Sequence, residues 1–162
     1  MTRSSKFATI LVVALAMVVL GATGALAAPH FASATASINN AGALVVSFDE
    51  RGLGNGNVDY TLTADATATY GCFNGGGNHP KAANKETSND DVSGGGTFEA
   101  KNGRVRASLM AGPISAGDFD CPGGQRLRLA SVSYSNILLT DTTNDESTGV
   151  TPDPISRTFF TV

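Results

Sequence analysis

The segment from Val58 to Cys72 alternates apolar or small residues with polar residues, without interruption. Its even positions carry Val, Tyr, Leu, Ala and Cys, and its odd positions carry Asp, Thr and Gly. Successive side chains of a β-strand point to opposite faces, so the pattern predicts a strand with its even face buried. Because about 15 extended residues would span about 50 Å, we expect a bend or break near Ala64 to Ala68.

The dipeptide Asn102-Gly103 predicts a β-hairpin, because both residues tolerate the positive φ angles of a type I′ turn. A two-residue loop would pair Lys101 with Arg104, Ala100 with Val105, Glu99 with Arg106, and Phe98 with Ala107. The apolar members of these pairs share one face. The turn and the apolar pattern therefore predict the same register.

Weaker alternation predicts two strands near the start, 32–38 and 43–49, joined by a turn at 39–42. In the second of them Leu44, Val46 and Phe48 face one way. A closing strand is expected over 155–162, after the prolines at 152 and 154.

The segment 125–140 also predicts a strand, but its apolar phase shifts twice. The shifts fall at Leu129-Ala130 and at Asn136-Ile137, and each is typical of a β-bulge. The inward side chains are expected to be Leu127 and Leu129 before the first shift, then Ala130, Val132 and Tyr134.

No stretch of ten or more residues shows helical periodicity, and about seven strands are expected, with glycine-rich connections. This pattern predicts an all-β fold: a single antiparallel β-sandwich, with a barrel as the alternative. The chain has no Trp, so the likeness to immunoglobulin domains extends to architecture only.

The first 27 residues have the layout of a secretory signal peptide. Arg3 and Lys6 precede an apolar run at 10–20, and Ala25-Leu26-Ala27 forms a small-x-small cleavage site. The alternative is a membrane anchor, which needs about 20 apolar residues. Two glycines and the absence of a positive flank after the run argue against an anchor. We therefore expect cleavage after Ala27 or Ala28, secretion, and one extracellular domain over 28–162.

Composition and charge narrow the class of partner. The chain is 15% charged with a net charge of −3, and loss of Arg3 and Lys6 would make it −5. A deficit of basic residues argues against nucleic acid and anionic membranes as partners. We expect a monomer that meets an extracellular or cell-surface ligand.

The only two cysteines, Cys72 and Cys121, are expected to form a disulfide, because exported proteins meet an oxidising environment. Asp118 and Asp120 flank Cys121. Negative neighbours disfavour a thiolate, so a reactive cysteine is not expected.

Two segments, 73–96 and 141–154, are predicted as long loops, and loops of this length in a small domain are typically functional or mobile. The first contains two glycine triplets and a basic pair on an acidic protein. Cys72 would hold its base, and the positive charge would attract an acidic group. The candidate binding residues are Asn74, Asn78, His79, Lys81 and Lys85.

No catalytic residue, metal site or cofactor is predicted. The two histidines, His30 and His79, have no triad-like spacing, and the sequence has no HExxH, GxSxG or P-loop pattern. Calcium remains an alternative at 141–146 or 89–91, where hard oxygen donors cluster without EF-hand spacing. Two function classes stay open: a non-catalytic module that binds a surface, polymer or protein through its loops, and a hydrolase without a recognisable motif.

Four stretches resemble a family of small secreted proteins of actinobacteria and some filamentous fungi. They are ATATYGCFNGGGNHPKAANK at 66–85, CPGGQ at 121–125, LASVSYSN at 129–136 and TDTTN at 140–144. The resemblance implies export and a single domain. It implies no activity and assigns no functional residue.

Overall fold

The computed structural model describes residues 27–74, 76 and 84–161. These residues form eight strands and no helix. The strands are β1 (His30–Ile38), β2 (Leu44–Arg51), β3 (Gly56–Phe73), β4 (Lys85–Ala100), β5 (Arg104–Ala111), β6 (Arg126–Asp141), β7 (Glu146–Gly149) and β8 (Ile155–Thr158). Within the described ranges, no helix is long and apolar enough to cross a membrane.

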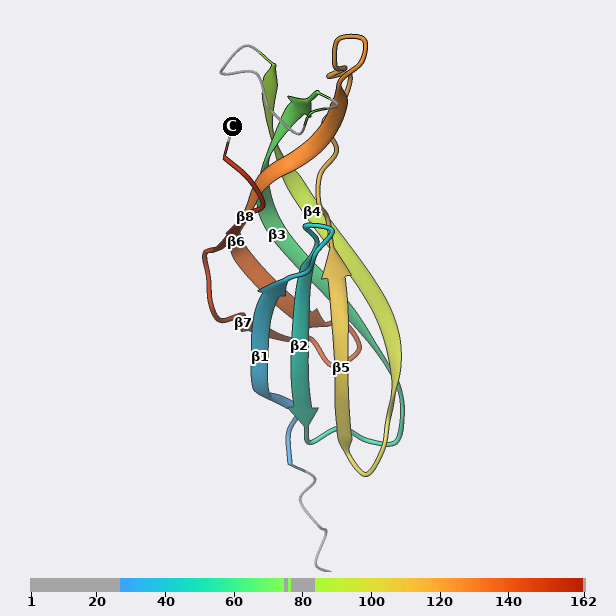
Figure 1. Cartoon of the computed structure of the whole chain (residues 1–162). Coiled ribbons are helices and arrows are strands. Elements are labelled where there is room, and N and C mark those ends of the chain that lie inside the picture. Colours follow the sequence, from blue (N-terminus) through green and yellow to red (C-terminus); the bar gives the residue numbers. More distant parts are fainter. Residues whose placement is uncertain (1–26, 75, 77–83, 162) are drawn as a thin grey trace, which may run out of the picture.

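The strands form two antiparallel sheets that pack face to face (Figure 1). One sheet has the order β1-β2-β5, and the other has the order β4-β3-β6-β7, with β8 also paired to β6. The predicted all-β antiparallel sandwich is confirmed, and the barrel alternative is wrong, since the two sheets do not close on each other.

Alternation in the sequence places the core as expected. Leu44, Val46 and Phe48 of β2 are at most 4% exposed, and the even positions of β3 from Val58 to Ala68 are at most 5% exposed. The rings of Phe48 and Tyr60 lie 4.6 Å apart between the two sheets. Large apolar side chains such as Leu44, Val46 and Phe48 each contribute about 1.5–3 kcal/mol through removal of their apolar surface from water.

A bend or a break was expected near Ala64 to Ala68. Strand β3 runs continuously for 18 residues, so a break there is wrong. The irregularities lie instead in β6, where the sequence predicted bulges. Asn136 and Ile137 together face Ala64, and Ala130 is inserted between the partners of Thr69 and Tyr70. Extra residues in one strand increase its bend and twist, which lets the long pair curve while β3 stays continuous.

The turn at Asn102-Gly103 is confirmed, but the predicted pairing beyond it is wrong. Both residues have positive φ, 54° and 73°, and the backbones of Lys101 and Arg104 exchange two hydrogen bonds. From there the two arms enter different sheets: β4 pairs with β3, and β5 pairs with β2. The apolar side chains of both arms do face one core, but from opposite sides.

Four further expectations need correction. The predicted loop 73–96 is a connection only as far as Asn84, because residues 85–96 belong to β4. The predicted loop 141–154 contains β7, and the closing strand β8 covers only Ile155–Thr158. Leu127 shares a face with the buried Cys72, as expected, but it is 38% exposed rather than buried, because it lies where no strand of the smaller sheet covers β6.

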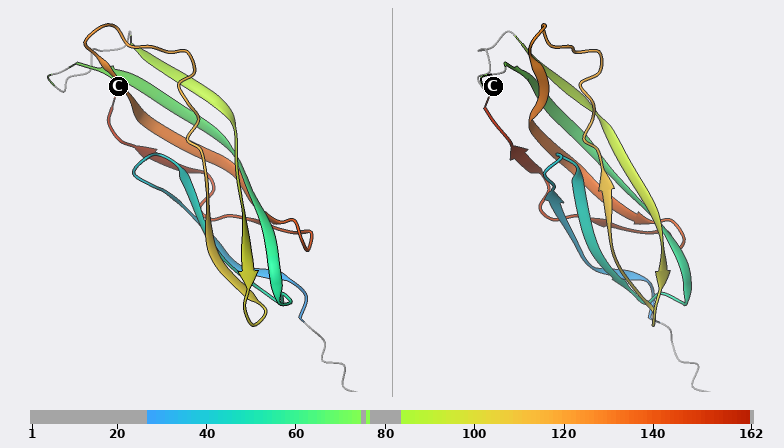
Figure 2. Two further views of the ribbon diagram at one scale, coloured as in Figure 1. Left: turned by 90° about the vertical axis from the view of Figure 1, so that its right-hand side faces the viewer. Right: turned by 45° about the vertical axis from the view of Figure 1, so that its right-hand side comes forward.

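The two sheets differ in length, and this difference shapes one end of the molecule. Strands β3, β4 and β6 have 16–18 residues, whereas β2 and β5 have eight. The larger sheet therefore extends beyond the smaller one (Figure 2). There the connector 112–125 runs along the larger sheet, and Tyr70 donates a hydrogen bond of 2.6 Å to the Ile114 carbonyl.

Candidate functional site

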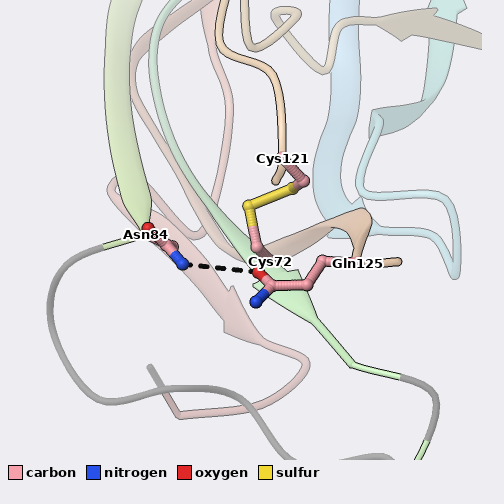
Figure 3. Close-up of a disulfide and its surroundings, with 4 residues drawn as sticks. All are labelled: Cys72, Asn84, Cys121 and Gln125. Atoms are coloured by element: carbon pink, nitrogen blue, oxygen red, sulfur yellow. Dashed lines mark hydrogen bonds between the residues drawn. A yellow bond between two sulfur atoms is a disulfide. The ribbon is translucent and has the colours of Figure 1, made fainter. Parts of the chain in front are cut away.

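The end at which the larger sheet extends is held by the predicted disulfide. Cys72 and Cys121 are bonded, with their Cα atoms 5.6 Å apart, so the connector is tied to the end of β3 (Figure 3). The Cys72 amide donates to the Asn84 carbonyl at 3.1 Å, and the Asn84 side chain donates to Gln125 Oε1 at 3.3 Å. These bonds hold together the two ends of the connection between β3 and β4.

Beside this end lies a hollow of about 430 Å³, which we call the end hollow. It is lined by Asn40, Ala41, Arg128, Leu129, Phe159 and Phe160. The turn between β1 and β2 forms one side. A Cβ atom at Gly42, where φ is +88°, would collide with the Leu129 side chain, so only glycine lets this turn approach β6 so closely.

Guanidinium groups and phenyl rings surround the end hollow. The Arg128 guanidinium lies 5.5 Å from the centre of the Phe73 ring, and Arg157 lies 4.9 Å from the centre of the Phe159 ring. Arg157 also donates to the Ile38 carbonyl and to Asn40 Oδ1, at 2.8 and 2.9 Å. Aromatic residues, phenylalanine included, and arginine are enriched at protein interfaces. The hollow suits an apolar group that carries an anionic or hydrogen-bond-accepting group beside it.

The predicted binding residues fall partly at this same end. Asn74 follows β3, and Lys85 is the first residue of β4; both are exposed. Asn78, His79 and Lys81 lie outside the described residues. Sequence reasoning missed Arg128, Phe159 and Phe160. The one available signal was the adjacent pair Phe159-Phe160, which breaks the alternation at the end of the last strand.

A second feature missed from the sequence is a buried polar cluster between the sheets. Glu50 and Asp141 have no solvent exposure, and the Tyr60 hydroxyl donates a hydrogen bond of 2.6 Å to Glu50 Oε2. Burial, together with the nearby negative charges of Asp141 and Glu146, raises the pKa of Glu50 to about 7, although the Tyr60 bond opposes this. The burial of both carboxyl groups could have been predicted from the alternation. Glu50 lies two residues after the inward Phe48, and Asp141 lies two residues after the inward Leu139.

The buried cluster is structural, because a substrate cannot reach fully buried carboxyl groups. Asp141 accepts hydrogen bonds from the amides of Thr143 and Asn144 and from the Asn144 side chain, at 2.6–3.0 Å. Its oxygens thus hold the turn between β6 and β7, where calcium was an alternative. In the described part of the chain, no group of three or more His, Cys, Asp or Glu residues is placed to hold a metal ion.

Comparison of the chain with protein-family models, with curated proteins and with solved structures found no match.

Proposed function

We propose that this protein is a secreted, non-catalytic module that binds a surface, polymer or protein partner through its disulfide-bearing end. The observation that carries the proposal is the end hollow, where phenyl rings and arginine side chains meet on a surface that the fold holds in place. The disulfide and the Cys72–Asn84 hydrogen bond constrain the end of β3 and the residue that precedes β4, and a constrained surface loses less conformational entropy on binding.

Two of the candidate binding residues support the same proposal. Asn74 and Lys85 lie at the same end of the larger sheet as Cys72, and Lys85 adds positive charge to an acidic chain. A partner with an acidic group beside an apolar group would contact both Lys85 and the end hollow.

Secretion is part of the proposal and has a direct test. The mature protein purified from culture medium should begin at Ala28 or Pro29, because the small-x-small site ends at Ala27. Aminoterminal sequencing or intact mass measurement checks this. A purified extracellular protein that retains residues 1–27 would contradict the signal-peptide interpretation.

Substitutions at the end hollow should weaken partner binding. The test incubates the tagged mature protein with cell-wall and culture fractions and measures the bound amount against protein concentration. Arg128→Gln should raise the apparent Kd about 30-fold, because loss of a central arginine contact costs about 2 kcal/mol. Arg126→Gln, an exposed arginine two residues away on the same strand, is the matched control for charge and should change the Kd little.

A second pair of variants tests the apolar part of the hollow. Phe159→Ser should weaken binding, whereas Leu138→Ser, at a 42% exposed leucine elsewhere on β6, should not. Thermal melts establish that each variant is folded. Equal binding by folded Arg128→Gln, Phe159→Ser and wild type would place the partner elsewhere and overturn the proposal.

A further inference from the structure

The outward face of β1, β2 and β5 carries an unusual concentration of arginine. Arg104 makes a two-pronged ion pair with Asp49, and Arg51 and Arg106 each lie 3.4 Å from the same carboxylate oxygen, Asp49 Oδ2. The strand register explains the grouping, because Arg51 pairs with Arg104, and Asp49 pairs with Arg106. We call these four residues the arginine cluster.

The cluster has a charge surplus. Three guanidinium groups meet one carboxylate, which leaves a local charge of +2 on a chain whose net charge is −3. Arg104 alone is enough to pair Asp49. The Arg51 and Arg106 side chains are 52% and 66% exposed, and most of their donors point to solvent. The neighbouring arginines hold the pKa of Asp49 below its ordinary value, so the arrangement persists across the neutral range.

A groove of about 490 Å³ leads away from the cluster across the same face. Besides Asp49 and Arg106, its lining consists mostly of hydroxyl side chains: Ser33, Thr35, Ser47 and Ser108. Ser47 and Ser108 face each other across the β2–β5 pair, with their oxygens 2.8 Å apart.

We propose that this face binds an acidic polysaccharide, with its anionic groups on Arg51 and Arg106 and its sugar hydroxyls along the serine and threonine row. Guanidinium groups pair with carboxylate and sulfate oxygens through two parallel hydrogen bonds. Hydroxyl side chains both donate and accept hydrogen bonds, as sugar hydroxyls do. The charged cluster continues into a row of hydroxyl side chains along the same face, and this arrangement fits a chain molecule better than a single small anion. This site is separate from the end hollow and does not depend on the proposed function.

The test measures binding of the mature protein to polygalacturonate, dextran sulfate, uncharged dextran and polyphosphate, by calorimetry at low and moderate salt. We expect binding to at least one of the two acidic polysaccharides, weaker binding at higher salt, and none to dextran. Binding to polygalacturonate would identify the anionic group as a carboxylate, and binding to dextran sulfate would identify it as a sulfate. Arg106→Gln should weaken binding about tenfold, as the loss of one charged hydrogen bond does, and Arg51→Gln with Arg106→Gln should weaken it further.

Arg126→Gln is the matched control, since it removes one exposed positive charge at the opposite end of the molecule. Four binding results would overturn the inference. The first two are no binding to either acidic polysaccharide, and binding to polyphosphate that is equally tight. The other two are an equal loss of polysaccharide affinity in Arg106→Gln and Arg126→Gln, and a loss of affinity in Arg128→Gln but not in Arg106→Gln. Sedimentation of the protein without polysaccharide measures its oligomeric state, and so tests whether a second copy of the chain covers this face. Self-association that Arg106→Gln abolishes would assign the face to contacts between copies and also overturn it.

Discussion

Replacing both cysteines, Cys72→Ser with Cys121→Ser, should lower the free energy of unfolding by about 2–5 kcal/mol. The bond joins residues 49 positions apart, so its loss frees a long loop in the unfolded chain. In the folded protein the bond also ties the connector 112–125 to the larger sheet. Urea unfolding of the oxidised wild type and of the double variant measures the difference.

The loss of stability should be greatest near the missing disulfide. Amide hydrogen exchange should speed up in the connector and at Cys72, whose amide donates to the Asn84 carbonyl, while β1 and β2 keep their relative protection. Reductant should destabilise the wild type and leave the double variant unchanged, which separates the bond from any effect of serine. Equal unfolding free energies for the oxidised wild type and the variant would contradict a stabilising role.

The second large effect concerns pH. Because the pKa of Glu50 is raised to about 7 from 4.5 in the folded protein, the folded state holds a proton that the unfolded state releases earlier. The stability that this carboxyl contributes is complete below about pH 4.5 and is lost as the pH rises through about 7. The unfolding free energy should therefore fall by roughly 3 kcal/mol at most between these values.

Glu50→Gln should remove most of this slope and raise stability at pH 8. Glutamine is neutral, has nearly the same shape, and keeps an oxygen that can accept the Tyr60 hydrogen bond. The control is Glu99→Gln, at an exposed glutamate whose side chain is 66% accessible, which should leave the slope in place. The Asp49 pKa is lowered, so its contribution is lost only as the pH falls below about 3.8, outside this window. A wild type with pH-independent stability between 4.5 and 8 would contradict the assignment.

The two proposed surfaces lie on different parts of the sandwich and have different chemistry. The end hollow combines phenyl rings with arginine beside a disulfide-anchored connection, whereas the arginine cluster occupies an open sheet face lined by hydroxyl groups. Arg128→Gln and Arg106→Gln are single-charge changes of the same kind. Together they assign any observed binding to one surface or the other.

Local features of the sequence were sufficient for much of the fold. The alternation at 58–72 determined a strand and its buried face, and the phase shifts in 125–140 determined two bulges, because side-chain direction in a strand depends only on neighbouring residues. Asn102-Gly103 determined a turn through its own φ angles. The sequence has only two cysteines, which left a single possible pairing.

Tertiary structure alone decided which strands pair and which side chains meet. The arms on either side of Asn102-Gly103 enter different sheets, because β3 offers β4 a 16-residue partner and β2 offers β5 a full eight-residue one. That choice brings Arg104 and Arg106 to Asp49, and it places Glu50 between the sheets beside Tyr60. Strand pairing is a competition among edges far apart in the chain, and the alternation within one strand carries no information about its partner.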